Sequence, residues 1–374
     1  MKSDNIAYNT LRQHNFNTIE SKPQSLCSLP SILEVSSETS FTENPILTFV
    51  SSDIKTYNSL FSSLSNNSEN NHSNLDKIST LRLGCLKFLG LKNTSDTKFN
   101  RNKISIIFRV PKPDKFQTDH WPSCSFYGLY SGHYGNSCAS FLKKNLHKMI
   151  FSDKNFPQRP KDAIINGFKQ ADEVFIKEAE EKFNLSGAFA IIVMIIGKKC
   201  YVANTGNCRG IVSLHEGRKI VEISRLHVPE NEEEKMRIIR NNGKVYRDYI
   251  QTTDGELKEV GKLRICPGKK CYTRSFGDID TKIREFGGIP GTVISDPYIK
   301  SFKINESCDF IGLMTQNLEN FSNENIVDGF WRGVGNDNNN VSSRIENLFD
   351  KIRGEDIQGN YSMMVIGLKE LNNC

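Results

Sequence analysis

The residues best suited to chemistry lie where a predicted strand, residues 125–131, meets a glycine-rich turn. Side chains alternate along this stretch with the period of two of a pleated strand, and Gly132 and Gly135 are expected to end it before a helix begins. A strand that ends in such a turn is a common place for a metal or phosphate site, and its last position usually carries an acid. Here that position is Ser131, which is uncharged, and His133 follows it within the turn.

The patterning of apolar residues predicts the elements that must hold this turn. We expect helices over residues 135–151 and 161–183, since apolar residues recur there at helical spacing. We also expect a charged helix over residues 230–241, stopped by Gly243, and helices over residues 324–331 and 341–352. We expect strands over residues 81–89, 103–110, 189–196, 201–205, 209–214, 219–223, 270–276, 299–304, 309–315 and 361–368. Residues 244–270 show no clear period and are expected to form a basic loop. Many strands with helices early and late favour two sheets packed face to face with helices outside.

Composition excludes several other classes of protein. The chain has 374 residues with 25% charged side chains and a formal net charge of +6, and no long Lys/Arg block, so nucleic acid is not an expected partner. Its longest apolar run, residues 188–197, is too short to span a membrane. Ten cysteines without a Cys-x-x-Cys pair, in a chain whose start does not resemble a signal peptide, are expected to be reduced thiols. We therefore expect a cytoplasmic or nuclear protein that does not bind membranes.

The first part of the chain differs from the rest. Residues 1–78 are rich in Ser, Asn and Thr and are predicted to be a disordered N-terminal region, and residues 79–374 are predicted to form the folded domain. Short apolar segments at 32–33 and 45–50 could dock on the domain or on a partner. A tethered tail without a role is the alternative.

Six segments, in order, resemble the motifs of the metal-dependent protein phosphatases of type 2C. Ser131-Gly132-His133-Tyr134-Gly135 resembles that family's Asp-Gly-His-x-Gly, and Thr273-Arg274-Ser275-Phe276-Gly277-Asp278 resembles its Ser-Arg-Ala-Phe-Gly-Asp. The other four segments are residues 186–190, 203–209, 315–320 and 359–362. The resemblance covers about residues 80–370. It implies an α+β fold: a four-layer α-β-β-α sandwich with two antiparallel sheets flanked by helix pairs.

The resemblance also implies a chemistry, which is hydrolysis of phosphoserine and phosphothreonine by water held between two Mg²⁺ or Mn²⁺ ions. Two such ions repel each other strongly, so carboxylate ligands must offset their charge. At the positions where the family has these acids, this chain has the neutral residues Ser131, Leu226, Gln316, Asn320 and Gly359. The site is therefore expected to be degenerate.

A few residues of the implied site are retained or replaced by similar ones. Lys92 stands at the position of the phosphate-binding arginine, and His133 matches the family's proposed general acid. Asp96, together with the main chain of Gly132, is the residual candidate for metal binding. Because neutral side chains do not repel one another, we expect the domain to be stable without ions.

These observations lead to three hypotheses. The first is a catalytically inactive domain, a pseudophosphatase, that needs no cofactor and binds a protein partner such as a kinase or a phosphoprotein. The second is a divergent Mg²⁺- or Mn²⁺-dependent serine/threonine phosphatase that draws Asp96, Asp278 or Asp280 into new roles. The third is that the N-terminal region carries the function and the domain serves as its scaffold.

Overall fold

The computed structural model describes residues 87–91 (backbone only), 101–110, 112, 122–251, 256–318, 321–331, 348, 351–352 and 361–368. All of them belong to residues 41–374, one of the two units into which the chain divides. The predicted N-terminal region, residues 1–78, lies outside the described residues. The boundary between residues 78 and 79 therefore stays a prediction.

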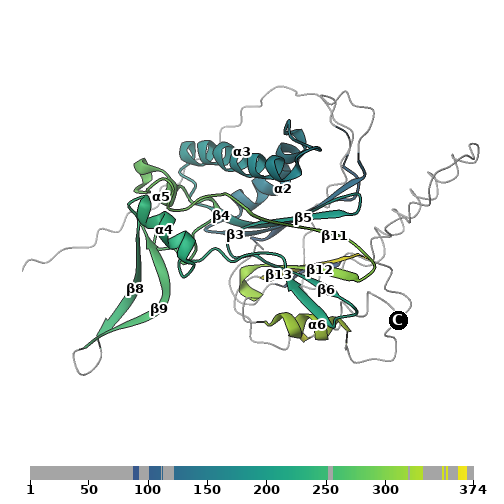
Figure 1. The fold of residues 1–374 in the computed structure, drawn as a ribbon. Coiled ribbons are helices and arrows are strands. Elements are labelled where there is room, and N and C mark those ends of the chain that lie inside the picture. Colours follow the sequence, from purple (N-terminus) through teal and green to yellow (C-terminus); the bar gives the residue numbers. More distant parts are fainter. Residues whose placement is uncertain are drawn as a thin grey trace, which may run out of the picture. The chain divides into compact units, whose positions relative to one another are not determined.

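Two antiparallel sheets form the centre of the domain (Figure 1). The first has the strand order β1-β13-β12-β6-β7, and the second has the order β11-β5-β4-β3-β2 with β10 paired beside β4. The strands of the first sheet are β1 (Lys87–Leu91), β6 (Arg209–Leu214), β7 (Lys219–Glu222), β12 (Cys308–Met314) and β13 (Tyr361–Gly367). Those of the second are β2 (Lys103–Ile107), β3 (Cys124–His133), β4 (Gly187–Ile196), β5 (Lys199–Thr205), β10 (Phe276–Gly277) and β11 (Tyr298–Lys303).

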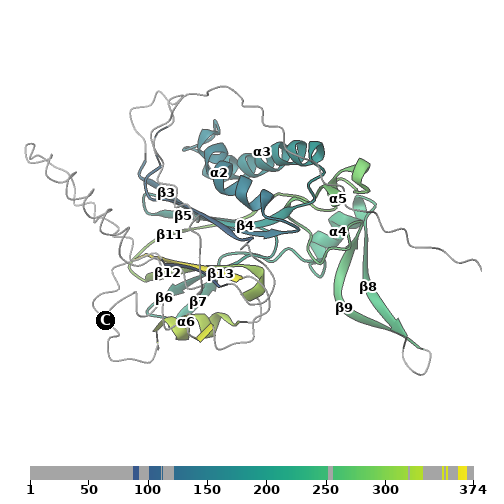
Figure 2. The same ribbon diagram turned by 180° about the vertical axis from the view of Figure 1, so that it is seen from behind.

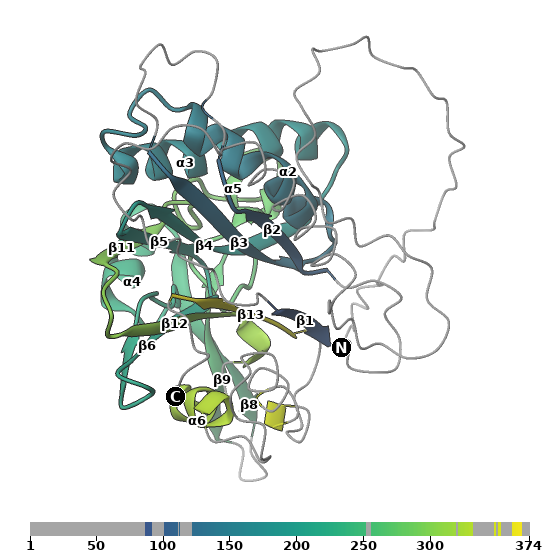
Figure 3. The ribbon, with the colours of Figure 1, turned by 90° about the vertical axis from the view of Figure 1, so that its right-hand side faces the viewer.

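Helices cover the outer face of each sheet, as Figure 3 shows from the side. The helices α2 (Ser137–Ser152) and α3 (Pro160–Glu181) pack their apolar stripes on the second sheet. The helix α6 (Asn323–Trp331) packs on the first sheet, and the helical residues Leu348 and Ile352 share its core. A third apolar cluster fills the space between the sheets. The expected α+β sandwich of four layers, with two antiparallel sheets between helices, is confirmed.

The prediction of a loop over residues 244–270 is wrong. A long hairpin leads away from the sheets there and is formed by β8 (Lys244–Gln251) and β9 (Leu257–Cys266), as seen from behind in Figure 2. Val245 and Ile265 at its base pack against Ile238 of α4 (Glu232–Arg240). Beyond that base both faces of the hairpin are largely exposed, so the sequence lacks the alternation that a half-buried strand imposes.

Two other boundaries differ from expectation. Strand β3 does not end at Gly132 but stays paired with β4 as far as His133. Residues 270–276 form two isolated bridges and only the first residue of β10 instead of a strand. The short helices α5 (Ile279–Lys282) and η1 (Arg284–Phe286) follow β10, and the short helix η2 (Gln316–Leu318) follows β12. None of the described helices is long and apolar enough to cross a membrane.

The buried His147 of α2 makes the fold sensitive to acid. Burial, reinforced by Lys148, lowers the pKa of His147 from 6.5 to about 4, so the folded domain holds this side chain neutral. A neutral histidine in the fold stabilises it above the unfolded pKa, and this contribution is lost as the pH falls from about 6.5 towards 4. Between about pH 7 and 5, the free energy of unfolding of the unaltered protein falls as His147 becomes protonated in the unfolded chain. We predict that this fall is about 2 kcal/mol smaller in His147→Leu.

Urea unfolding at the two pH values measures this difference. His215→Asn is the matched control, because His215 is exposed in the β6–β7 turn at φ 55° and asparagine tolerates that conformation. Equal pH dependence of His147→Leu and the unaltered protein would contradict the prediction.

Candidate functional site

The end of β3 and the turn that follows it are held tightly by their neighbours. Ser131, Gly132 and His133 pair with residues 189, 188 and 187 of β4. A Cβ atom on Gly132 would lie 2.6 Å from the Arg101 carbonyl oxygen, so only glycine fits there. Tyr134 follows with φ 52° and is 65% exposed, so its ring stands on the surface of the turn.

His133 points at a buried carboxylate. Its Nε2 atom lies 2.8 Å from Asp278 Oδ2, and the Tyr272 hydroxyl donates to the same oxygen at 3.0 Å. Ser275 also donates to this carboxylate. Burial alone would raise the pKa of Asp278, but His133, with Lys270 and Ser275, lowers it well below its usual range. The aspartate is therefore a charged, fully bonded part of the structure.

Lys270 supplies a second cation at the same place. Its side chain is 3% exposed, and its ammonium nitrogen lies 3.0 Å from Asp280 Oδ2 and 3.5 Å from Asp278 Oδ1. The same nitrogen lies 4.0 Å from the centre of the Tyr134 ring. Burial alone would lower the pKa of Lys270, but Asp278 and Asp280 raise it above its ordinary value. The positive charge of Lys270 thus lies between the Tyr134 ring and the carboxylates of Asp278 and Asp280.

The structure gathers several predicted positions at one end of the sandwich. The Arg101 carbonyl abuts Gly132, and the next residue, Asn102, donates from Nδ2 to Ser362 Oγ at 2.9 Å. Ser362 in turn donates from its amide to Thr315 Oγ1 at 2.9 Å. A chain of contacts therefore links the end of β3 to the end of β12 and the start of β13.

Gln316 begins η2 directly after Thr315, at that same end of the sandwich. Leu226 is 42% exposed beside the buried His227, whose ring lies 3.1 Å from the Gly206 carbonyl oxygen. The remaining predicted site residues, Lys92, Asp96, Asn320 and Gly359, lie outside the described residues. Their roles stay predictions, as do the roles of Ser131, Gln316 and Leu226.

The described residues do not fit a pair of divalent ions. In the described part of the chain, no group of three or more His, Cys, Asp and Glu side chains is placed to hold a metal ion. Ser131, Gln316 and Leu226 bring no negative charge, and the carboxylates of Asp278 and Asp280 already face the Lys270 ammonium. A two-ion centre needs several anionic oxygens, which these side chains do not offer.

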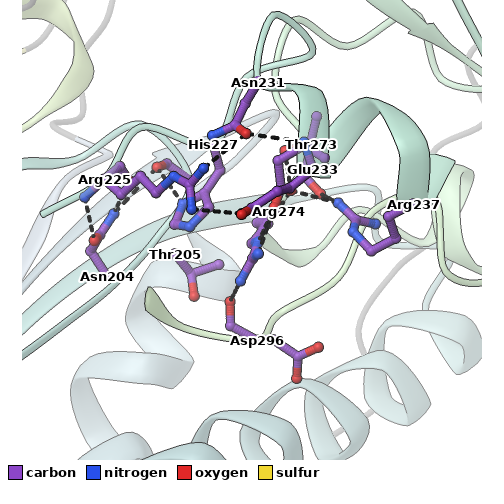
Figure 4. A network of polar contacts seen from close by, with 12 residues as sticks. Asn204, Thr205, Arg225, His227, Asn231, Glu233, Arg237, Thr273, Arg274 and Asp296 are labelled. Carbon is purple, nitrogen blue, oxygen red and sulfur yellow. Dashed lines mark hydrogen bonds and ion pairs between the residues drawn. The ribbon is translucent and has the colours of Figure 1, made fainter. Parts of the chain in front are cut away.

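Sequence reasoning missed a buried ion-pair network that fixes α4. Glu234 accepts hydrogen bonds from Arg274 and from the Thr273 hydroxyl, and Arg237 donates to it at 2.7 Å. Figure 4 shows Thr273, Arg274 and Arg237 close together. Burial alone would raise the pKa of Glu234, but these partners lower it to about 2. The network connects α4, which the hairpin follows along the chain, to residues 273–274. These residues lie a few positions before Asp278. Glu234 lies in a run of three glutamates, so the sequence does not single it out.

We predict that Glu234→Gln lowers the free energy of unfolding by about 3 kcal/mol, because it leaves two partly buried guanidinium groups without their carboxylate. Glu233→Gln is the matched control, since Glu233 is exposed and pairs only with Arg225, at 2.7 Å, among the described residues. We expect this control to change stability by less than about 1 kcal/mol. Chemical denaturation of both variants checks the prediction, and equal losses would contradict it.

Comparison with solved structures shows the class of fold. A sex-determining protein of C. elegans aligns with a TM-score of 0.61 at 15% identity, over 88% of this chain and 77% of that one. A serine-threonine phosphatase 2C from Toxoplasma gondii aligns with a TM-score of 0.50 at 17% identity, over 76% of this chain and 99% of that one. At such identities the likeness concerns the fold alone.

The family profile of protein phosphatase 2C matches residues 94–351. The chain therefore belongs to the protein phosphatase 2C family. Probable protein phosphatase 2C 57 of Oryza sativa subsp. japonica is 32% identical over 148 residues, which are 39% of this chain and 40% of the rice protein. Protein phosphatase 2C homolog 2 of Hypocrea jecorina is 24% identical over 267 residues, which are 69% of this chain and 57% of that protein. The chain thus spans about half the length of these curated relatives.

Proposed function

We propose that this chain is a catalytically inactive member of the family, a pseudophosphatase, that acts as a protein-binding or regulatory module. The observation that supports this most is the buried Lys270 ammonium between Asp278 and Asp280. An ion that took either carboxylate as a ligand would lie within a few ångströms of this cation. Like charges at such separations repel by several kcal/mol inside a protein. The neutral residues at the acidic positions of the family support the same proposal.

The partner is proposed to be a protein, such as a kinase or a phosphoprotein, in the cytoplasm or nucleus. All cysteines of the described residues are free thiols, most of them buried, which fits a reducing compartment.

The alternative is a divergent Mg²⁺- or Mn²⁺-dependent protein serine/threonine phosphatase. The names of the relatives favour it, as does the retention of His133 in the turn. Against it, His133 Nε2 already contacts Asp278 and the Tyr272 hydroxyl. A histidine bonded in this way is better suited to fixing the turn than to delivering a proton to a leaving group.

We predict that calorimetric titration of the full chain with Mn²⁺ detects no binding tighter than about millimolar. We also expect that turnover of a phosphothreonine peptide at saturating Mn²⁺ does not exceed that of Ser131→Ala. Ser131 lacks the charge to bridge two ions, so its replacement by alanine should change nothing. Tighter Mn²⁺ binding together with turnover above the Ser131→Ala background would establish the enzyme instead.

A second prediction concerns the lysine itself. Lys270→Met leaves Asp278 and Asp280 without their shared cation, and we expect a loss of stability of about 3 kcal/mol. We further expect Mn²⁺ to raise the melting temperature of this variant but not that of the unaltered protein, because a divalent cation can then approach the two carboxylates. Thermal melts with and without Mn²⁺ measure both effects.

Lys269→Met is the matched control, since Lys269 is the exposed neighbour of Lys270 in the same turn. We expect it to match the unaltered protein in both melts. If Lys270→Met is as stable as the unaltered protein, Lys270 does not supply the positive charge that Asp278 and Asp280 require.

A further inference from the structure

A pair of aromatic rings, one of them strongly exposed, lies at the end of α3, close to the turn after β3. Phe183 is 78% exposed, and its ring centre lies 5.8 Å from that of Phe286 in an edge-on arrangement. Phe286 belongs to η1 and is half-buried against the core of the α2–α3 layer. Leu185, two residues beyond Phe183, is 46% exposed. We call Phe183, Leu185 and Phe286 the aromatic patch.

Hydrogen bonds fix the backbone that carries the aromatic patch. The amide of Asn184 donates to the Ala179 carbonyl oxygen at 2.8 Å, which closes the end of α3. The Asn184 side chain accepts from the Ser186 amide at 3.0 Å. Phe183 itself has φ 51°, the left-handed conformation common directly after a helix end. The structure therefore presents two large apolar side chains to solvent on a backbone that is bonded in place.

Acidic residues surround the aromatic patch. Glu180 and Glu181 precede Phe183, Glu285 precedes Phe286, and none of the three makes an ion pair with another described residue. The carboxyl end of α3 adds the negative end of its helix dipole, and the last turn carries no basic residue to offset it. Lys182 is paired with Glu178 at 3.0 Å. Arg284, two residues before Phe286, is then the cation next to the patch along the chain. The rim thus carries excess negative charge.

The aromatic patch adjoins the turn through Ser186. The Ser186 hydroxyl accepts from the Cys138 amide at 3.2 Å, and its carbonyl accepts from the Asp278 amide at 3.3 Å. A Cβ atom on Gly135 would lie 3.1 Å from Ser186 Cβ. The segment that carries Phe183 and Leu185 is therefore built onto the same backbone that supports the degenerate site.

We propose that the aromatic patch docks a basic, leucine-bearing segment of a partner protein, whose apolar side chains cover Phe183 and Leu185 while its lysines or arginines face the glutamates. An apolar centre with a charged rim of one sign is complementary to such a segment. This inference rests on the proposed binding role and names the surface and the partner chemistry for it.

The test uses fluorescence anisotropy with the full chain and a labelled amphipathic peptide of about 15 residues that has leucines on one face and lysines on the other. We expect saturable binding that weakens as salt is raised. Phe183→Ala is expected to weaken it about tenfold, as for a central aromatic contact. Glu181→Lys is expected to weaken it several-fold, with most of the change in the association rate.

Ile165→Ala is the matched control, because Ile165 is an exposed apolar residue on α3 outside the aromatic patch, and it should leave the affinity unchanged. A second peptide with glutamates in place of the lysines should bind at least tenfold more weakly. Equal affinity of Phe183→Ala and the unaltered protein, or equal affinity for both peptides, would overturn the proposal. Self-association of the chain that Phe183→Ala abolishes would also overturn it, by assigning the surface to a second copy.

These outcomes are separate from those that test catalysis. Failure of the peptide to bind, with no Mn²⁺ binding or turnover, removes this surface assignment and leaves the inactive domain standing. Mn²⁺-dependent turnover removes the inactive domain, whatever the peptide does.

Discussion

The buried charge of Asp278 is the interaction on which the end of the sandwich depends. An isolated carboxylate away from water is very costly, so the surrounding structure must supply hydrogen bonds and positive charge. His133 is the last residue of β3, while Lys270, Tyr272 and Ser275 come from the segment that follows the hairpin. Because the partners belong to different parts of the chain, satisfying one carboxylate fixes their relative positions.

This arrangement differs from the charge balance of a two-metal site. In a two-metal phosphatase, divalent cations balance the clustered acids, and the empty site carries repulsion. In this chain the Lys270 ammonium lies against Asp278 and Asp280. The motif resemblance places neutral residues such as Ser131 and Gln316 where the family has acids. The described side chains at this end thus balance one another's charge, which supports the proposal that the domain needs no divalent metal to be stable.

The sequence predicted the elements that are long and strongly patterned. Strands β4 and β12 and helices α2 and α3 bury most of one or both faces, so apolar residues repeat at spacings that identify them. The β8–β9 hairpin was missed because most of it is exposed on both faces. Its pairing is set by backbone hydrogen bonds, which leave little trace in the pattern of side chains.

The motif resemblance indicated Ser131, His133 and Asp278 as residues of interest, and the structure places the His133 ring against the Asp278 carboxylate. The functional roles of these residues stay predictions. The role of Lys270 could not be foreseen, since it depends on a tight turn that brings this residue back against α5 and the Tyr134 ring. Glu234 escaped notice for a related reason: of three consecutive glutamates only one faces inward, and helix phase against Arg274 decides which.

A module that binds without catalysis gains affinity when its contact residues are held in the bound geometry beforehand, since less conformational freedom is lost on association. The end of α3 meets this condition, because Asn184 fixes the backbone between Phe183 and Leu185 by two hydrogen bonds. Ser186 then joins this segment to the α2 start and to Asp278. The charge balance at the turn and the shape of the aromatic patch are thus properties of one continuous piece of backbone. Since the Asp278 amide donates to the Ser186 carbonyl oxygen, we expect a change that releases Asp278 from Lys270 to disturb the segment that carries Phe183 as well, which couples this ion pair to the proposed docking surface.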